Sequence, residues 1–308
     1  MKLLLAFIFS LFAAVTATPN PLPGTENVVA RGPSIIYNGD SKKYFLFHTA
    51  KGINISTSPS LTGPWSHAGI VLTNGSKIPI PPEHTGTEAA DVNFINGRYV
   101  LYYAPSMESG TWQDHGAVIH SSSATKYNAI DPNTIVTPTG FKLTFGSWSQ
   151  GIFQVPMTNI TAPATPPPGA HLAGGNQTPS EAGFTYKPKK ADFFYLFYSN
   201  GISPLPGAAT RPPPGKEYKV LVERSKNVDG PYVDQTGLSL TDPPAGTLVL
   251  GSHDNVYAPG GQSVYLDPVS GRDVIAYYYI RKDEIGGLPF LGINFLDFSS
   301  GWPELVAK

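Results

Sequence analysis

The feature that most constrains the fold is a pattern that recurs five times: a short strand, a tight turn and a strand rich in aromatic residues. The repeats begin at Pro33, Ala90, Asp131, Glu181 and Gly261, and their aromatic strands begin near Tyr44, Tyr99, Phe141, Phe194 and Val274. Third strands, INISTS and YKVLVERS, follow two of them. Spacings of roughly 40 to 80 residues between such units are typical of a β-propeller. A β-sandwich would not explain the repeated order, so we predict an all-β, five-bladed β-propeller in a single domain.

Two Pro-rich stretches and one short repeat modify this pattern. The stretches ATPPPGAH, residues 164–171, and LPGAATRPPPG, residues 205–215, are expected to be surface loops because the repeat continues after each. In the second repeat, YYAPSMESGTWQDHGAV passes almost directly from the aromatic strand to the next turn. We expect the third strand of that blade to be missing or much reduced.

The N-terminus has the features of a secretory signal peptide. Lys2 precedes an apolar run from Leu3 to Val15 and small residues around Ala17, and this run is too short for a typical membrane span of about 20 residues. We predict a signal peptide over residues 1–17, a propeller domain over residues 18–308, and a secreted, extracellular protein. Passage through a glycosylating pathway agrees with the sequons at Asn54, Asn74, Asn159 and Asn176.

The charge balance limits the classes of partner. The chain has 21 Lys and Arg against 22 Asp and Glu, and charged residues make up only 14%. This gives no electrostatic reason to expect nucleic acid or an anionic membrane as a partner. The chain has no cysteine, so disulfides do not hold the fold. We expect a monomer.

The first strands of propeller blades line the central channel, so the starts of the repeats should converge on one pocket. These starts are Gly32, the Ala90–Asp91 pair, Asp131, Glu181 and the turn 259–261. Carboxylates brought together from separate blades suggest acid–base chemistry on a neutral substrate, as in glycoside hydrolysis. For Asp131, which precedes Pro132, the capping of a turn is an alternative role.

Several motifs resemble those of a known family. The stretches NAIDP, FGSWSQGIFQV, SEAGFTYK, VERSKNVDGPY, SHDNVYAPG and LGINFLDFSSGWP are similar to the arabinanases of glycoside hydrolase family 43, in the same order from about Val29 to Pro303. The resemblance implies a five-bladed propeller that hydrolyses α-1,5-linked L-arabinan, a polysaccharide of plant cell-wall pectin, with inversion at the anomeric carbon.

The resemblance also implies roles for individual residues. Glu181 in SEAGF corresponds to the general acid, and Asp131 in NAIDP to the acid that raises the pKa of the proton donor and positions it. A substrate-contacting wall is implied for Asn128, Ala129, Ile130, Ser147 and Trp148. For Trp148, a buried position in the core is the alternative.

The chain departs from the family's pattern at the centre. Arg31-Gly32-Pro33 stands where the family has His-Asp-Pro, so the position of the family's general base is Gly32, which cannot accept a proton. Glu88 replaces an expected tryptophan and is one candidate for a substitute base. Gly261 replaces a histidine that helps hold a central metal ion or water, so we expect a central calcium ion to bind weakly and predict no certain cofactor. Because Pro33 follows it, Gly32 is expected to be extended.

Two functions therefore remain open at this point. The first is a secreted hydrolase of arabinan that uses Glu181 as the acid together with a relocated base. The second is a catalytically impaired propeller that binds arabinan or another plant cell-wall glycan in the same groove. Release of reducing sugar from linear arabinan would distinguish the two.

Overall fold

A computed structural model describes residues 17–73, 75–78, 87–104, 112–239, 241 and 245–307. The predicted signal peptide, apart from Ala17, and the sequon at Asn74 lie outside these residues. Within them, no helix is long and apolar enough to cross a membrane. One short 3₁₀ helix, η1, spans Trp148–Gln150, and the regular structure is otherwise made of strands.

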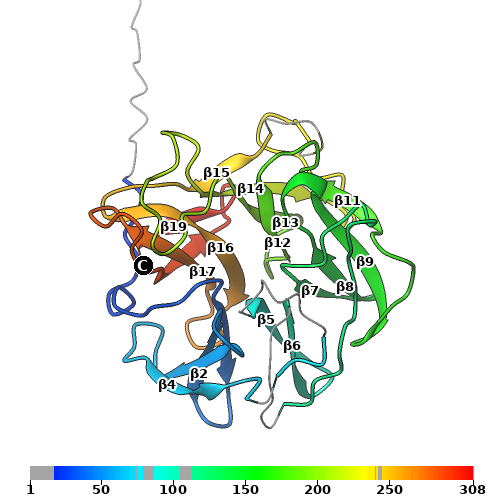
Figure 1. Ribbon diagram of the computed structural model, residues 1–308, viewed down its shortest axis with the longest axis horizontal. Helices are drawn as coiled ribbons and strands as arrows, with labels where there is room; N and C mark the ends of the chain where they lie inside the picture. Colours follow the sequence, from blue (N-terminus) through cyan, green and yellow to red (C-terminus); the bar gives the residue numbers. More distant parts are fainter. Residues whose placement is uncertain are drawn as a thin grey trace, which may run out of the picture.

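Four antiparallel sheets with at least four strands each are arranged around a central axis (Figure 1). The first contains β1 (Ser34–Asn38), β2 (Lys43–His48), β3 (Asn54–Ser58) and β4 (Ser66–Ile70). The next contains β7 (Asn133–Thr137), β8 (Gly140–Phe145), β9 (Ile152–Asn159), β10 (Ala162–Pro163) and β11 (Ala170–Ala173). The others are β12 (Ser180–Tyr186), β13 (Phe194–Asn200), β14 (Lys219–Ser225) and β15 (Thr247–Leu250), then β16 (Val256–Leu266), β17 (Asp273–Arg281), β18 (Phe290–Asp297) and β19 (Glu304–Val306).

The predicted number of blades is wrong. The structure is a four-bladed propeller, because in its described residues the second repeat forms only a two-stranded hairpin of β5 (Glu88–Ile95) and β6 (Arg98–Ala104). The hairpin lies between β1 and β7 around the axis. Residues 112–129 follow it without any strand, in agreement with the expected loss of a third strand. The repeat keeps the pattern for two strands, and Val118 and Ile119 farther along pack against the cluster that contains Tyr102 and Phe145 without forming a strand.

The sequence pattern predicts the other strands well. The five aromatic strands form β2, β6, β8, β13 and β17, and the two predicted third strands form β3 and β14. Of the Pro-rich stretches, residues 205–215 form a loop, whereas the end of 164–171 enters β11, which pairs with β9.

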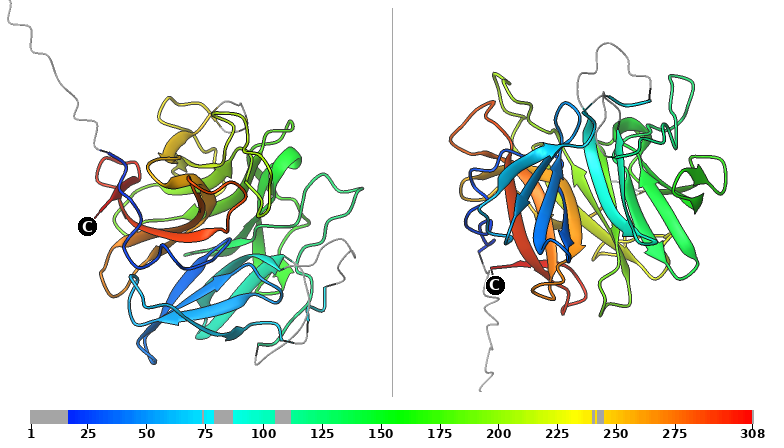
Figure 2. Two further views of the ribbon diagram at one scale, coloured as in Figure 1. Left: turned by 60° about the vertical axis from the view of Figure 1, so that its left-hand side comes forward. Right: turned by 90° about the horizontal axis from the view of Figure 1, so that it is seen from below.

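Apolar side chains fill the interfaces between neighbouring sheets. Leu46 of β2 packs with Ile293 of β18, and Phe197 of β13 packs with Tyr277 of β17, all of them nearly or fully buried. Similar clusters join β5–β6 to the sheets on both sides. Viewed from the side, the strands run between the two faces of the ring (Figure 2, right).

The N-terminal segment helps to close the ring. Val29 forms a β-bridge with Phe290, and the Leu22 N–H donates to the carbonyl of Ile293 at 2.8 Å. Residues 22–30 thereby lie along the first half of β18, and β19 pairs with its second half. Because β1 begins just after this segment, the last sheet is tied to the first.

The first strand of each repeat is the inner strand, which lies nearest the axis. Hydrogen bonds between sheets join the inner strands β1, β5 and β7 each to the next inner strand. Ser34 Oγ accepts from the Val92 N–H at 3.1 Å, Asp91 Oδ2 from Thr134 at 2.7 Å, and Asn133 Oδ1 from Thr185 at 2.8 Å. These three acceptor residues are buried. Each acceptor lies two residues after a left-handed residue at the start of its repeat, namely Gly32, Ala89 or Asp131. Each donor lies three residues after such a residue, namely Ala89, Asp131 or Ala182. We call these contacts the inter-sheet hydrogen bonds.

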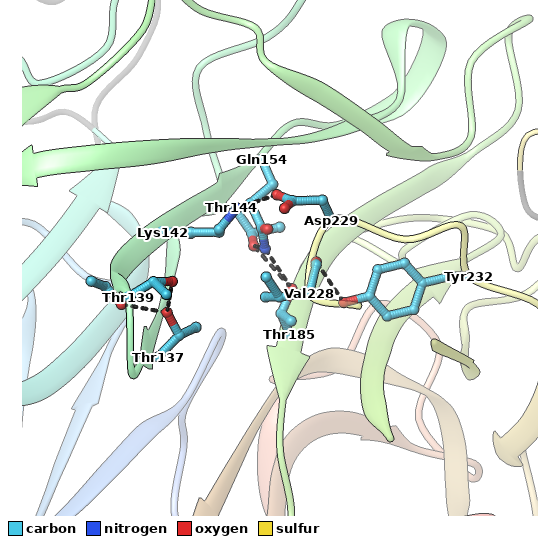
Figure 3. A network of polar contacts seen from close by, with 10 residues as sticks. Thr137, Thr139, Lys142, Thr144, Gln154, Thr185, Val228, Asp229 and Tyr232 are labelled. Atoms are coloured by element: carbon cyan, nitrogen blue, oxygen red, sulfur yellow. Dashed lines mark hydrogen bonds and ion pairs between the residues drawn. The ribbon is translucent and has the colours of Figure 1, made fainter. Parts of the chain in front are cut away.

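A second polar contact reinforces the junction between β7–β11 and β12–β15. Gln154 Nε2 of β9 donates to Thr144 Oγ1 of β8 at 2.9 Å and to Thr185 Oγ1 of β12 at 3.2 Å (Figure 3). The two threonine hydroxyls lie 3.0 Å apart. Lys142 and Asp229 form an ion pair nearby. The sheets that carry Asp131 and Glu181 are therefore held together by polar as well as apolar contacts.

The burial of Asp91 predicts a pH dependence of stability. Burial raises the pKa of Asp91 to about 7. An unfolded carboxyl ionises near pH ~4, so this group's contribution to stability is complete below that pH and is lost as the pH rises to about 7. Asp91→Asn cannot ionise and keeps an acceptor for Thr134. Urea unfolding at about pH 4 and about pH 8 should show the variant losing less stability than the wild type, by up to about 4 kcal/mol.

Asp297→Asn is the matched control. Hydrogen bonds from Ser299 lower the pKa of Asp297, so removing this carboxyl group should change the pH dependence in the opposite direction. Equal pH dependence in the wild type and Asp91→Asn would contradict the prediction.

Candidate active site

A pocket of about 120 Å³ lies on the axis, and the start of every repeat contributes residues to it. The predicted convergence of the repeat starts is therefore observed. The residues that line it include Gly32, Asp91, Asp131, Glu181 and Gly261.

Two hydroxyl groups orient Glu181, the second residue of β12. Ser147 Oγ donates to its Oε2 at 2.9 Å, and the Tyr218 hydroxyl donates to its Oε1 at 2.7 Å. Ser147 and Glu181 also form an isolated β-bridge. Because each carboxylate oxygen has its own donor, the plane of the half-buried carboxyl group is set by contacts from two different segments.

Asp131 is placed beside Glu181 by the backbone. Its φ of 54° is left-handed, and its Oδ2 accepts from the Ala182 N–H at 2.9 Å. Burial and the nearby Glu181 carboxylate raise the pKa of Asp131 above its ordinary value. Asp131 therefore does more than cap its own turn: it bonds the residue that follows Glu181.

The expected extended conformation of Gly32 is wrong, because its φ is 54°. Asp131, which also precedes a proline, has the same φ, so the turn at the start of the repeat overrides the preference imposed by the proline. A Cβ atom at Gly32 would lie 3.3 Å from Thr49 Oγ1 and 3.6 Å from the Ala89 backbone. An aspartate there would need a small movement of Thr49 and would adopt a conformation that Asp131 already has.

Arg31 extends its side chain along the pocket wall. Its guanidinium carbon lies 5.0 Å from the centre of the Tyr278 ring, and Nη2 donates to Ser203 Oγ at 3.3 Å. Ser203 Oγ and the Tyr278 hydroxyl are 2.6 Å apart. No carboxylate of the described residues lies within ion-pair distance of Arg31. The pocket therefore contains a cation that is held by an aromatic ring and a hydroxyl group.

The predicted substrate-contacting residues lie in different environments. Ile130 lines both the central pocket and a wider cavity of about 760 Å³ beside β6, and Asn128 and Ala129 line the wider cavity only. The Ser147 hydroxyl is used by Glu181. Trp148 is 44% exposed, which excludes the core position, but it lines neither cavity.

The wider cavity lies where the second repeat has no third strand. The segment 112–121 runs along its far side, and Trp112 packs edge-on against Phe47 at 5.8 Å between ring centres. The two cavities share Glu88, Ile130 and Pro132. The central pocket and the wider cavity therefore adjoin at Glu88.

Sequence reasoning missed Tyr218, the second donor to Glu181. A signal was available, because in an antiparallel sheet the third strand starts at the same end as the first. Since β12 starts at the pocket, the residue just before β14 had to return to it. Arg31 contacts Ser203 and Tyr278. No sequence signal pointed to these two contacts, because Ser203 comes from a long loop and Tyr278 from another sheet.

The surroundings of Gly261 support the prediction that a central calcium ion binds weakly. Gly261 has no side chain, its N–H donates to Ser199 Oγ at 2.8 Å, and the Tyr278 ring fills the space where a Cβ would be. In the part of the chain that the structure describes, no three His, Asp or Glu side chains are grouped to share a metal ion. Calcium prefers six to eight oxygen ligands, which these residues do not supply.

Comparisons with known proteins agree with the motifs. The profile of glycosyl hydrolases family 43 matches residues 25–303. A probable arabinan endo-1,5-alpha-L-arabinosidase A of Aspergillus flavus is 38% identical over 312 residues, which is 94% of each chain. Arabinan endo-1,5-alpha-L-arabinosidase A of Aspergillus aculeatus is 38% identical over 309 residues, or 93% of each chain.

Solved structures show the same likeness. An exo-1,5-alpha-L-arabinanase from a bovine ruminal metagenomic library superposes with a TM-score of 0.77 at 25% identity, over 92% of this chain and 98% of that one. A family 43 endo-arabinanase from Bacillus licheniformis superposes with a TM-score of 0.74 at 26% identity, over 92% and 99% of the two chains.

The geometry around Gly261 predicts little effect of calcium. After dialysis against EDTA, addition of about 1 mM CaCl₂ should shift the melting temperature by less than about 2 °C, because an ion bound more weakly than about 1 mM adds under about 0.4 kcal/mol. Differential scanning calorimetry would measure this shift, with MgCl₂ as the control salt. A calcium-specific rise of several degrees would contradict the prediction.

Proposed function

The chain belongs to family 43 of the glycosyl hydrolases, and on that premise we propose that it hydrolyses α-1,5-linked L-arabinan of plant cell-wall pectin outside the cell. The arabinanase names of the relatives support the substrate. The apolar run from Leu3 to Val15 after Lys2 supports secretion.

The observation that carries the proposal is the arrangement around Glu181. Its carboxyl group borders the axial pocket, is oriented by Ser147 and Tyr218, and lies beside Asp131. Glu181 is the general acid that protonates the oxygen of the leaving sugar. Asp131, through its bond to the Ala182 N–H, keeps the backbone of the acid in position.

The wider cavity supports a polymeric substrate. It adjoins the axial pocket at Glu88 and is lined by Trp112, Tyr102 and Tyr103 together with polar groups such as Asn128. Aromatic faces and hydrogen-bonding groups are the usual contacts of sugar rings. A chain longer than the cleaved linkage can therefore continue into this space.

The reaction we propose inverts the anomeric centre. In such a reaction one carboxyl group protonates the leaving oxygen while another accepts a proton from water on the opposite face of the sugar. The first-formed sugar would then have the β configuration, which proton NMR of the early product distinguishes from the α configuration.

A glycan-binding role without catalysis is the second candidate. It is favoured by Gly32, which has no side chain at the start of β1, and by the raised pKa of both Asp91 and Asp131, which leaves fewer charged carboxylates in the pocket. Binding of arabino-oligosaccharides without any release of sugar would support this role.

Replacement of the acid tests the hydrolase directly. Glu181→Gln should lower kcat on linear arabinan about 10²–10⁴-fold, because general acid catalysis typically contributes that factor. Reducing-sugar release measures the rate, and circular dichroism checks the fold. A variant as active as the wild type would show that Glu181 is not the acid.

The hydroxyl donors to Glu181 give a milder prediction. Tyr218→Phe removes one charge-assisted hydrogen bond and should lower kcat about 10-fold or more with little change in KM, because such bonds contribute about 1.5–3 kcal/mol. Tyr257→Phe, in the same aromatic cluster but without a contact to Glu181, is the control. An unchanged kcat for Tyr218→Phe would mean that Ser147 alone suffices.

A further inference from the structure

The carboxyl groups of the axial pocket differ in their availability for chemistry. Four residues with carboxyl groups line it: Glu88, Asp91, Asp131 and Glu181. Inverting hydrolysis needs one of them as the proton donor and a second, charged one as the acceptor for water. Glu181 is the proposed donor, so the acceptor must be found among the other three.

Asp91 and Asp131 use their carboxyl groups in hydrogen bonds that hold neighbouring strands together. Asp91 Oδ2 accepts hydrogen bonds from Thr134 N and Asn93 Nδ2, and only 3% of the residue is exposed. Asp131 Oδ2 accepts from Ala182 N, and the pKa of Asp131 is raised by burial and by Glu181. A carboxyl group whose oxygen already accepts a backbone N–H is less available to accept a proton from water.

Glu88 differs from Asp91 and Asp131 in its exposure and in its hydrogen bonding. It is the exposed first residue of β5, and no inter-sheet hydrogen bond uses its side chain. The left-handed Ala89 and the bulge between Glu88 and Asp91 separate it from the regular ladder. It borders the axial pocket and the wider cavity at the same time, so water from the wider cavity reaches it.

Arg31 supplies a charge that favours this arrangement. Burial lowers the pKa of Arg31, but the Tyr278 and Tyr218 hydroxyls and the carboxylates of Glu88 and Glu181 outweigh it and raise the pKa. The guanidinium is therefore a permanent cation within electrostatic reach of Glu88. It is anchored on Tyr278 and Ser203, so it does not block the carboxylate by direct contact.

We propose that Glu88 is the general base of this chain, acting from β5 in place of a side chain at Gly32. The proposal rests on the hydrolase function proposed above. Glu88 accepts a proton from water as the water oxygen bonds to the anomeric carbon. The glycosidic carbon–oxygen bond breaks on the opposite face, and the departing oxygen takes the proton of Glu181.

The test compares conservative variants on linear arabinan. Glu88→Gln should lower kcat about 10²–10⁴-fold with little change in KM. Glu304→Gln is the matched control, since Glu304 is an exposed glutamate that likewise begins a strand, β19, far from the pocket. This control should retain wild-type activity.

A double variant shows whether Glu88→Gln loses activity through loss of the base or through misfolding. Gly32→Asp added to Glu88→Gln should restore part of the lost rate, because it returns a carboxylate to the pocket in a backbone conformation that Asp131 already adopts. Wild-type rates for Glu88→Gln, with Glu181→Gln inactive, would overturn the role of Glu88 and leave the hydrolase standing. A wild-type protein that binds arabinan and releases no sugar would overturn both.

Discussion

The inter-sheet hydrogen bonds are the constraint on which the pocket depends. Sheets of a propeller share no ladder of backbone bonds, so the inner strands could slide past one another without strongly changing the apolar area buried. Ser34, Asp91 and Asn133 each bond a defined backbone N–H of the next inner strand and so fix its height along the axis. Asp131 makes the same kind of bond at the level of the pocket, to Ala182.

The left-handed residues at the starts of the repeats determine which side chains face the pocket. At such a residue the strand departs from its regular course, so the side chains on either side of it can face the channel. The same geometry occurs at Gly32, Ala89, Asp131, Ala182 and Gly261. Whether a repeat contributes a carboxyl group, a backbone donor or empty space therefore depends on one or two residues, while the scaffold stays unchanged.

The acidic residues of the pocket differ in burial and therefore in the roles they can have. Burial raises the pKa of Asp91 and Asp131 and favours their neutral forms, while their hydrogen bonds tie them to the next strand. Glu88 is exposed beside the cavity that the short hairpin leaves open. The absence of outer strands from the described part of the second repeat thus affects the site as well as the fold, because the wider cavity beside the hairpin adjoins one side of the axial pocket.

The first two strands of each repeat, their order and the family could be inferred from the sequence alone. The alternation of turn and aromatic strand is local chemistry, so the starts of β2, β6, β8, β13 and β17 could be predicted, as could the convergence of Asp131 and Glu181. Motifs such as SEAGF and LGINFLDFSSGWP are contiguous and identify glycosyl hydrolase family 43 without any structure.

The number of blades, the φ of Gly32 and the partners of Glu181 could be known only from the three-dimensional structure. Each depends on contacts between residues far apart in the chain. Residues 112–129 did not extend the two strands of the second repeat, the turn shared by the repeats outweighed the effect of Pro33, and Tyr218, just before β14, reached Glu181 within the same sheet. Sequence patterns report local preference, and such contacts can override it because burial and hydrogen bonding across sheets outweigh the preference of a single residue.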